Sequence, residues 1–346
     1  MILVTGGAGF IGSHIVELLV ADGHEVRVLD MVLPSAHRER PQVHPDAEFI
    51  EGDVRDAAVL VDALADVDAV CHQAAMVGLG ADIRDLPDYV SHNDLGTAML
   101  LGELARREFE GRVVLASSMV VYGEGRYRCE RDGIVAPSPR DIQALAGGEF
   151  EVACPECGAQ LAPESVPESA VLDPRNVYAA TKLHQEHLGL AFSRETGVPV
   201  TALRYHNVYG PRMPRDTPYA GVASIFRSAL ENGQPPRVFE DGGQLRDFVH
   251  VRDVARANVL ALTEPTPVPG AFNIGSGRPR SILQMAKALA KAFDGDLDPV
   301  VTGDFRLGDV RHVFATTDLA GEVLGFIPQE DFADGMAEFA DAPLRA

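Results

Sequence analysis

Residues 2–12 read Ile2-Leu3-Val4-Thr5-Gly6-Gly7-Ala8-Gly9-Phe10-Ile11-Gly12, and this stretch decides the fold. A short apolar strand runs into three glycines spaced as G-x-x-G-x-x-G, and a helical pattern follows. Glycines in such a turn let the backbone approach a ligand closely, and the following helix N-terminus attracts phosphate. We therefore expect a dinucleotide pyrophosphate here, with a purely structural tight turn as the alternative.

The rest of the chain alternates strands with helices. Further strands are expected over residues 25–30, 48–52, 69–72, 112–117 and 200–204, and helices over 13–22 and 178–195. This alternation predicts an α/β fold with a Rossmann-type doubly wound parallel sheet. We assign residues 1–204 to this domain, with an insertion over about 124–170. Residues 205–346 are expected to form mainly a smaller substrate-binding domain, with 246–263 returning to the Rossmann domain.

Composition limits the partners. The 346 residues carry a formal net charge of −21, which disfavours nucleic acid and anionic membranes. The chain shows no signal-like leader and no apolar run of membrane-spanning length. We therefore expect a cytoplasmic protein whose four cysteines are reduced or metal-bound.

Acidic residues follow the second and third strands. Asp30 ends the second strand, where a carboxylate accepts from adenosine ribose hydroxyls and repels a 2′-phosphate, so NAD is favoured over NADP. The alternative for Asp30 is a solvated strand end. Asp53 and Val54 are placed to meet the adenine, and Ala74 and Ala75 allow the backbone to come close to the cofactor.

A proton-transfer group is predicted near the middle of the chain. Tyr178 and Lys182 lie four residues apart, one helical turn, so a phenol stands beside an ammonium. Such a phenol can remove the proton of an alcohol while a dinucleotide accepts the hydride. Ser117 and Ser118 follow a buried strand, and a serine hydroxyl at the carboxyl end of a parallel strand faces the same cleft. The alternative for Tyr178 and Lys182 is an ordinary surface pair.

With these residues, the chain resembles the extended short-chain dehydrogenase/reductases, in the nucleotide-sugar epimerase branch. Further similar segments are 93–97, 203–211 and 246–251. The resemblance implies catalysis by Ser118, Tyr178 and Lys182, and dimerisation through helices near 94–107 and 177–195. The candidate apolar positions on these helices are Ala98, Leu101, Leu104, Leu183, Leu190 and Phe192. It implies NAD contacts from Gly6, Gly9, Phe10, Ile11, Gly12, Asp30, Asp53, Val54, Ala74, Ala75, Asn93, Tyr178 and Lys182. It implies nucleotide-sugar contacts from Ser118, Asn207, Arg246 and Arg306, where each arginine has a surface ion pair as its alternative.

Nucleotide-sugar dehydratases resemble the same template but carry an acidic pair where this chain has Met119 and Val120, which cannot move protons. We therefore expect a 4-epimerase that works through a transient 4-keto sugar. A nucleotide-sugar dehydrogenase or reductase stays open, as does an NAD-sensing binding protein. The sugar nucleotide also stays open between dTDP-L-rhamnose and a UDP-hexose or UDP-hexuronate.

The long connection between Tyr122 and Tyr178 holds two similar segments, Cys129–Gly133 and Cys154–Gly158. It is similar to the insertion of bacterial epimerases associated with dTDP-L-rhamnose. The second segment is a Cys-Pro-x-Cys-Gly knuckle, and the first has an aspartate in place of its second cysteine. The predicted Zn²⁺ ligands are Cys129, Asp132, Cys154 and Cys157. A metal-free remnant and a Cys154–Cys157 disulfide are the alternatives.

Overall fold

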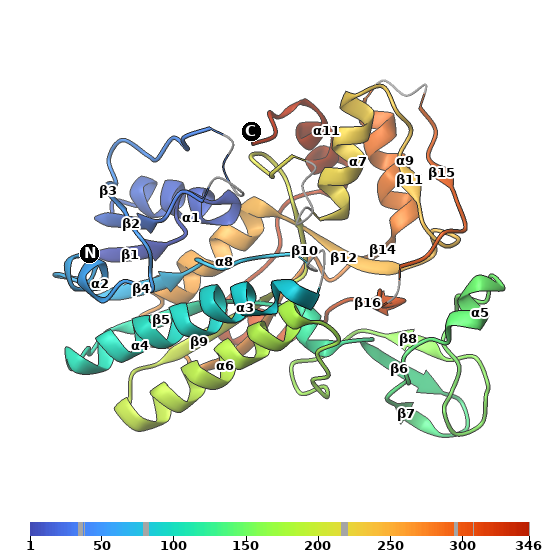
Figure 1. Ribbon diagram of the computed structural model, residues 1–346, viewed down its shortest axis with the longest axis horizontal. Helices are drawn as coiled ribbons and strands as arrows, with labels where there is room; N and C mark the ends of the chain where they lie inside the picture. The colour runs from blue at the N-terminus through green and yellow to red at the C-terminus, as the bar shows by residue number, and fades with distance from the viewer. Residues whose placement is uncertain are drawn as a thin grey trace.

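The computed structural model describes residues 1–33, 37, 39–78, 83–215, 221–293, 297–306 and 308–345. Within these residues, a sheet of seven parallel strands has the order β13-β9-β5-β4-β1-β2-β3 (Figure 1). The strands are β1 (Ile2–Thr5), β2 (Val26–Asp30), β3 (Glu48–Glu51), β4 (Ala69–His72), β5 (Arg112–Ser118), β9 (Val200–Tyr205) and β13 (Gly270–Ile274). The strand order reverses direction at β1, so the predicted Rossmann-type α/β fold is confirmed. A ligand crevice is expected where the central strands end.

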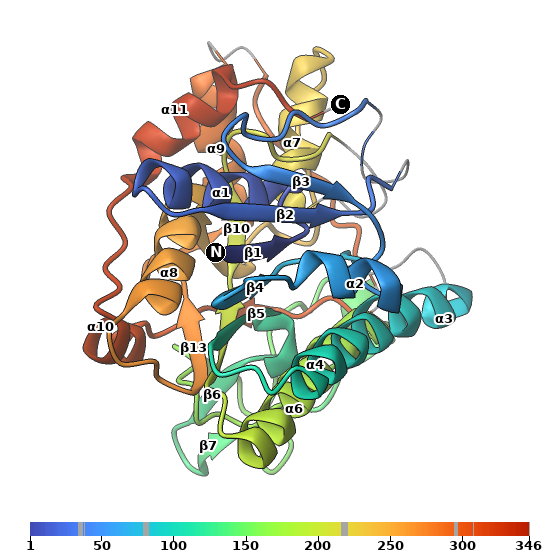
Figure 2. The same ribbon diagram turned by 90° about the vertical axis from the view of Figure 1, so that its left-hand side faces the viewer.

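Helices cover both faces of this sheet, which gives three layers (Figure 2). One face carries α1 (Phe10–Ala21), α8 (Val251–Thr263) and α10 (Asp318–Leu324), and the other carries α2 (Ala57–Ala63), α4 (Gly96–Arg106) and α6 (Val177–Thr196). Successive residues of a parallel strand are therefore buried on opposite sides. In β1, Leu3 packs into one core and Val4 into the other.

The C-terminal half forms a helical group beside the ends of the central strands (Figure 1). It contains α7 (Val222–Glu231), α9 (Ile282–Ala292) and α11 (Phe332–Asp341), packed around Phe226, Met285 and Phe339. A small sheet joins β10 (Asn207–Tyr209), β12 (Leu245–His250), β14 (Pro279–Ser281) and β16 (His312–Val313). The predicted return over 246–263 contains α8. The edge strand β13 also belongs to the seven-stranded sheet, although it lies beyond residue 263. Its short sequence Gly-Ala-Phe-Asn-Ile was not predicted to form a strand.

The insertion stands apart from the main layers as a small antiparallel sheet with one short helix (Figure 1). It contains β6 (Arg126–Cys129), β7 (Gly133–Val135), α5 (Ile142–Ala146) and β8 (Ala162–Glu164). Its buried cluster consists of Tyr127, Cys129, Val152, Cys154 and Leu161. Two of these five side chains are cysteines, so the insertion has little apolar core of its own.

The remaining elements are short. They are a 3-10 turn (Ile83–Asp85), α3 (Leu86–Tyr89), a π-helical turn (Val90–Leu95), a 3-10 turn (Met119–Tyr122), β11 (Arg237–Val238) and β15 (Val300–Val301). The π-helical turn runs directly into α4. Across the described part of the chain, no helix combines the length and the apolar character needed to cross a membrane.

Candidate functional site

A cavity of about 1060 Å³ lies over the carboxyl ends of the central strands. Its volume exceeds the space that one drug-sized ligand needs, so a dinucleotide and a second ligand can share it. The predicted site residues on its wall are Gly6, Gly9, Phe10, Ile11, Gly12, Asp30, Asp53, Val54, Ala74, Ala75, Ser118, Tyr178, Lys182, Asn207, Arg246 and Arg306. Asn93 and the four predicted metal ligands lie away from this wall.

The glycine turn joins β1 to α1 and needs its glycines for two different reasons. Gly6 has φ +69°, a left-handed conformation that side chains with a Cβ rarely adopt. A Cβ at Gly12 would lie 2.2 Å from the Gly6 carbonyl oxygen, so a larger residue would force the helix away from the turn. The N-terminus of α1 is thereby held at the cavity, where its amides favour a phosphate group.

Asp30 is fixed at the end of β2 by backbone donors. Its carboxylate accepts from the amides of Ala8 at 3.1 Å and Val32 at 3.0 Å. His37 Nε2 lies 3.8 Å from this carboxylate, and Arg345 donates to the carbonyl of Ala8. The predicted repulsion of a 2′-phosphate by Asp30 is therefore partly offset by Arg345, which is remote in sequence and was missed in the sequence analysis.

Asp53, which is predicted to meet the adenine, lines the cavity and is already paired with Arg55. Arg55 Nε lies 2.9 Å from Asp53 Oδ2, and Arg55 Nη2 lies 2.5 Å from it. Burial raises the pKa of Asp53, but the hydrogen bonds and charge of Arg55 outweigh burial and hold that pKa below its usual value. On the neighbouring strand end, a Cβ at Gly6 would meet the Ala74 amide nitrogen at 2.7 Å. This contact shows how closely the two loops approach, as expected where small residues let the backbone near a cofactor.

Asn93 has a different position from the one predicted. It is fully buried on the π-helical turn, and its amide bonds both the N–H and the carbonyl of Met76, at 2.7 and 3.0 Å. Its Nδ2 also donates to Thr181 Oγ1 on α6 at 3.0 Å. The side chain thus ties the loop after β4 to the helix that carries Tyr178. Both ends of the Asn93 amide are therefore bonded within the protein, and the predicted contact of Asn93 with NAD stays a prediction.

The three predicted catalytic residues come from two adjacent elements. Ser118 is the last residue of β5, while Tyr178 and Lys182 lie on the first turns of α6. The side chain of Asn176 caps this helix by accepting from the Ala179 amide at 2.8 Å. All three catalytic candidates line the cavity that the glycine turn also lines. A reacting alcohol can therefore contact both a proton acceptor and a bound dinucleotide.

Burial sets the proton affinities of this group. It raises the pKa of the Tyr178 phenol, and a hydrogen bond with Ser118 opposes that shift. It lowers the pKa of Lys182 to about 8, against the attraction of Asp94 and Glu186. The Lys182 ammonium was expected to lower the pKa of Tyr178. In the structure it donates to the Ala116 carbonyl at 2.8 Å and lies 5.8 Å from the centroid of the Tyr178 ring.

A buried ion pair supports α6 one turn beyond Lys182. Arg204 on β9 binds Glu186 through two contacts, Nε to Oε1 at 2.9 Å and Nη2 to Oε2 at 2.8 Å. Glu186 also accepts from the Ser117 hydroxyl, and Arg204 donates to the Tyr122 hydroxyl at 2.8 Å. This network ties α6 to β5 and β9. The sequence analysis assigned no role to either residue, although Arg204 lies in the family-like segment 203–211, because the pairing of Arg204 with Glu186 appears only in the fold.

The predicted nucleotide-sugar residues lie on the C-terminal side of the cavity. Arg246 Nη1 donates to the Arg311 carbonyl at 2.9 Å, and its Nη2 donates to the Val310 carbonyl at 2.6 Å. Arg306 is exposed and lies over the Phe239 ring, 5.2 Å from its centroid. Asn207 Oδ1 is buried, and no hydrogen-bond partner for it occurs among the described residues. Two cations and an unpaired amide oxygen thus face the cavity, a suitable set for a polar anionic ligand.

His206 also faces the cavity and is buried, with burial lowering the pKa of its imidazole. Its ring is therefore neutral near pH 7. The sequence analysis assigned it no role.

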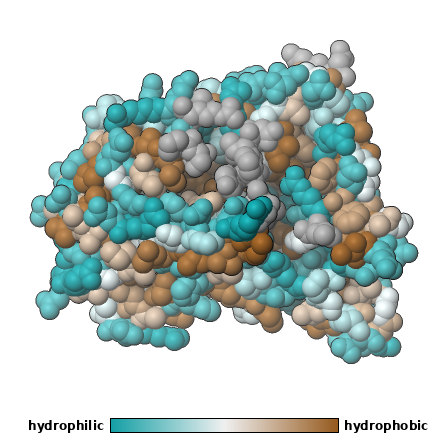
Figure 3. Space-filling model, viewed as in Figure 1, coloured by the Kyte–Doolittle hydropathy of each residue, from teal (hydrophilic) through white to brown (hydrophobic). Residues whose placement is uncertain are grey.

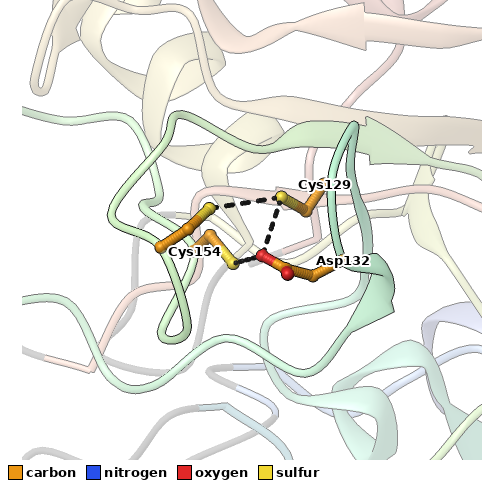
Figure 4. Close-up of side chains that lie close together, drawn as sticks. Cys129, Asp132 and Cys154 are labelled. Carbon is orange, nitrogen blue, oxygen red and sulfur yellow. Dashed lines mark hydrogen bonds between the residues drawn. The ribbon is translucent and has the colours of Figure 1, made fainter.

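The predicted metal ligands converge within the insertion. Their four ligand atoms, three Sγ and one carboxylate oxygen, all lie within 4.8 Å of one another. Figure 4 shows Cys129 and Asp132, from one segment of the insertion, pointing toward Cys154 from the other. Asp132 Oδ2 lies 3.3 Å from the Sγ atoms of both Cys129 and Cys154.

Comparisons with known proteins agree with this geometry. The model of the NAD dependent epimerase/dehydratase family matches residues 2–141 and 153–275. The chain is 35% identical to a dTDP-L-rhamnose 4-epimerase from Burkholderia thailandensis, covering 97% of this chain and 93% of that protein. It is 31% identical to a putative UDP-glucose 4-epimerase from Methanocaldococcus jannaschii, covering 97% and 96%.

Among solved structures, the Thermus thermophilus UDP-glucose 4-epimerase in complex with NAD is similar to this chain with a TM-score of 0.78. The two are 30% identical, and the match covers 98% of this chain and 97% of that one.

Proposed function

Because this chain belongs to the NAD dependent epimerase/dehydratase family, we propose that it is a nucleotide-sugar 4-epimerase whose substrate is dTDP-L-rhamnose. One observation carries the proposal: Ser118, Tyr178 and Lys182 line the same cavity as the glycine turn. The choice of sugar is supported by the similarity to a dTDP-L-rhamnose 4-epimerase over nearly the whole chain.

The site residues divide the reaction between them. Tyr178 removes the proton of the sugar's C4 hydroxyl and later returns a proton to the C4 oxygen, while Ser118 hydrogen-bonds that oxygen. Lys182 and the glycine turn hold NAD, which when bound accepts the C4 hydride and returns it to the opposite face. Arg246, Arg306 and Asn207 hold the diphosphate and the sugar, and the roomy cavity allows the ketosugar to turn.

A dehydratase is disfavoured by the residues that follow Ser118. Met119 and Val120 both line the cavity at the positions where an elimination would need an acid and a base. Neither side chain can accept or donate a proton. The same wall therefore favours a reaction that changes only the configuration at C4.

The direct test is incubation with dTDP-L-rhamnose, UDP-glucose and UDP-glucuronate without added cofactor, followed by NMR of the sugar ring protons. We expect a C4-inverted product from dTDP-L-rhamnose at substoichiometric enzyme. Net reduction of NAD with release of an oxidised sugar would instead assign a dehydrogenase. Binding of NAD with no change to any sugar would favour a sensor.

The preference for NAD over NADP should depend on two opposing charges, the carboxylate of Asp30 and the guanidinium of Arg345. Asp30→Ala is expected to narrow the preference for NAD over NADP by about tenfold, because the charge that opposes a 2′-phosphate is lost. Arg345→Ala should widen it, because an offsetting cation is lost. Calorimetric titration of both cofactors measures the two shifts. Equal or tighter NADP binding by the unchanged protein would overturn the assignment of Asp30.

The proposal includes a homodimer formed through α4 and α6, which pack side by side. Figure 3 shows a band of hydrophobic surface across this face of the molecule. Leu95, at the end of the turn before α4, and Leu190 on α6 are 48% and 45% exposed. Leu101, Leu104 and Phe192, which the pattern also offered, are buried against the sheet and cannot contribute.

Sedimentation at micromolar concentration tests the dimer, and Leu190→Glu should shift it toward monomer by placing a charge in the interface. Glu195→Lys, an exposed change on the same helix, serves as its control. Monomeric unchanged protein would refute the dimer.

The proposal also places the protein in the cytoplasm, where free thiols stay reduced.

A further inference from the structure

We propose that Cys129, Asp132, Cys154 and Cys157 hold a structural Zn²⁺, and that this centre supports the arginine that binds the substrate diphosphate. The metal site stands on its own geometry, whereas the link to the diphosphate rests on the proposed function. Both parts follow from contacts within the insertion and between the insertion and the wall of the cavity.

Three of the six separations between the four ligand atoms are close to those of a metal tetrahedron, and all six are within 4.8 Å. With Zn–S near 2.3 Å and Zn–O near 2.0 Å, two sulfurs stand about 3.8 Å apart and a sulfur and an oxygen about 3.5 Å. The Sγ atoms of Cys129 and Cys157 lie 3.5 Å apart, and Asp132 Oδ2 lies 3.3 Å from two sulfurs. Three sulfurs and one carboxylate complete the coordination, which is typical of a structural site rather than a catalytic one.

Neighbouring groups orient two of the four ligands, Asp132 and Cys129. The second carboxylate oxygen of Asp132 accepts from Arg131 Nε at 2.9 Å, which leaves Oδ2 directed at the sulfurs. Backbone amides of Arg131 and Asp132 are directed at the Cys129 sulfur. Gly133 and Gly158 end the two knuckles with φ +76° and +74°, so each chain can turn back after its last ligand.

The insertion also needs a constraint beyond its own packing. Its buried cluster has five side chains, and two of them are ligands. Units of this size rarely hold a fold by apolar burial alone and depend on a metal or on disulfides. The structure shows all its cysteines as free thiols, so a bound metal is the constraint that fits.

Just before each knuckle lies a residue that hydrogen-bonds the segment 311–312. On β6, the Tyr127 hydroxyl accepts from the His312 amide at 3.1 Å, two residues before Cys129. Just before Cys154, Glu151 binds Arg311 Nε at 3.0 Å and His312 Nε2 at 3.1 Å. Residues 311–312 are therefore held by Tyr127 and Glu151, which precede the first ligands of the two knuckles by two and three residues.

The same segment holds Arg246. The carbonyls of Val310 and Arg311 accept from its guanidinium and fix it at the cavity wall. Metal loss frees β6 and Glu151, and the carbonyls that orient this guanidinium lose their support. The metal thus acts on diphosphate binding at a distance, whereas the glycine turn proposed to hold NAD lies between β1 and α1, outside the segment 311–312 that the insertion contacts.

Elemental analysis of full-length protein purified without chelator tests the metal. We expect about one zinc per chain in the unchanged protein, and less than about a tenth of an equivalent in Cys154→Ser/Cys157→Ser. Cys71→Ala, which removes a buried thiol outside the insertion, should keep its zinc. Unchanged protein with less than about a tenth of an equivalent of any transition metal, or with a Cys129–Cys157 disulfide, would overturn the site.

Calorimetry with dTDP and with NAD as separate probes tests the link. We expect the metal-free variant to bind dTDP about tenfold more weakly and NAD with unchanged affinity, because one charge-assisted contact is misplaced. Unchanged dTDP affinity in a zinc-free variant that still binds NAD would refute the link.

Tyr127→Phe decides the link if the cysteine variant fails to fold. It keeps all four ligands and removes only the hydroxyl that accepts from His312. Weaker dTDP binding with zinc retained supports the link, and unchanged binding refutes it. If the unchanged protein binds neither dTDP nor UDP, the proposed function and the link both fail, while the zinc content still decides the metal site.

Discussion

Replacing Tyr178 with phenylalanine is expected to lower turnover by at least about 10²–10⁴-fold, the range that a positioned general acid–base contributes. NAD and the nucleotide sugar should still bind. The substitution removes one hydroxyl and leaves the ring in place, 6.2 Å from the ring of Tyr89 between centroids. Loss of turnover with retained binding would therefore report on the proton chemistry alone.

The physical reason lies in the burial of the site. Burial raises the pKa of Tyr178, so the phenol is a strong base once its proton is lost and a poor donor before substrate and cofactor arrive. Lys182 has a pKa of about 8 because burial penalises its charge, so its ammonium is present at neutral pH and is lost as the pH rises above 8. The Lys182 ammonium donates to the Ala116 carbonyl at 2.8 Å, so we assign the transfer of the proton to Tyr178.

Single-turnover measurements with the bound substrate, together with calorimetry for both ligands, check this expectation. Tyr89→Phe is the matched control, because it removes a neighbouring hydroxyl that bonds the carbonyls of Val77 and Gly78. Its effect on turnover should be much smaller. Near-normal turnover by Tyr178→Phe would mean that another group is the base.

Local motifs allowed much of the fold and the site to be predicted. The strand before the glycine turn agrees with β1 at both ends, and β4 agrees equally well, because buried parallel strands stand out as short apolar runs between turns. Tyr178 and Lys182 were found because their spacing alone fixes them on one helix face. For motif residues of this kind, the relative positions of the side chains follow from their spacing in the sequence.

Residues whose role depends on distant partners could not be assigned in this way. Asn93 belongs to a family-like segment, but only the fold shows that Met76 and Thr181 occupy its amide. Arg345 reaches Ala8 from the far end of the chain. Periodicity could not show which face of α4 packs on the sheet, so Leu101 was offered to a dimer when it belongs to the core.

Removal of the Glu186 carboxylate should have the largest effect on stability. Glu186→Ala is expected to lower the free energy of unfolding by about 3–5 kcal/mol, because the partner arginine is left charged, buried and unpaired. The side chains of Arg204 and Glu186 are only 5% and 9% exposed, so water cannot replace the lost contacts. The hydroxyl of Ser117 also loses its acceptor.

The shift in urea midpoint, multiplied by the slope of the transition, measures this loss. Glu195→Ala removes an exposed carboxylate near the end of the same helix and should change stability by no more than about 0.5 kcal/mol. A cost below about 1 kcal/mol for Glu186→Ala would mean that Arg204 finds another partner or remains hydrated, contrary to its burial.

The position of this ion pair also links stability to catalysis. Glu186 lies one turn beyond Lys182 on α6, and Arg204 lies on the strand next to the one that ends in Ser118. The pair therefore holds the helix bearing Tyr178 and Lys182 against the strand bearing Ser118. Folded Glu186→Ala protein, assayed well below its transition, should turn over more slowly while binding NAD normally. Normal turnover there would limit the ion pair to a role in stability.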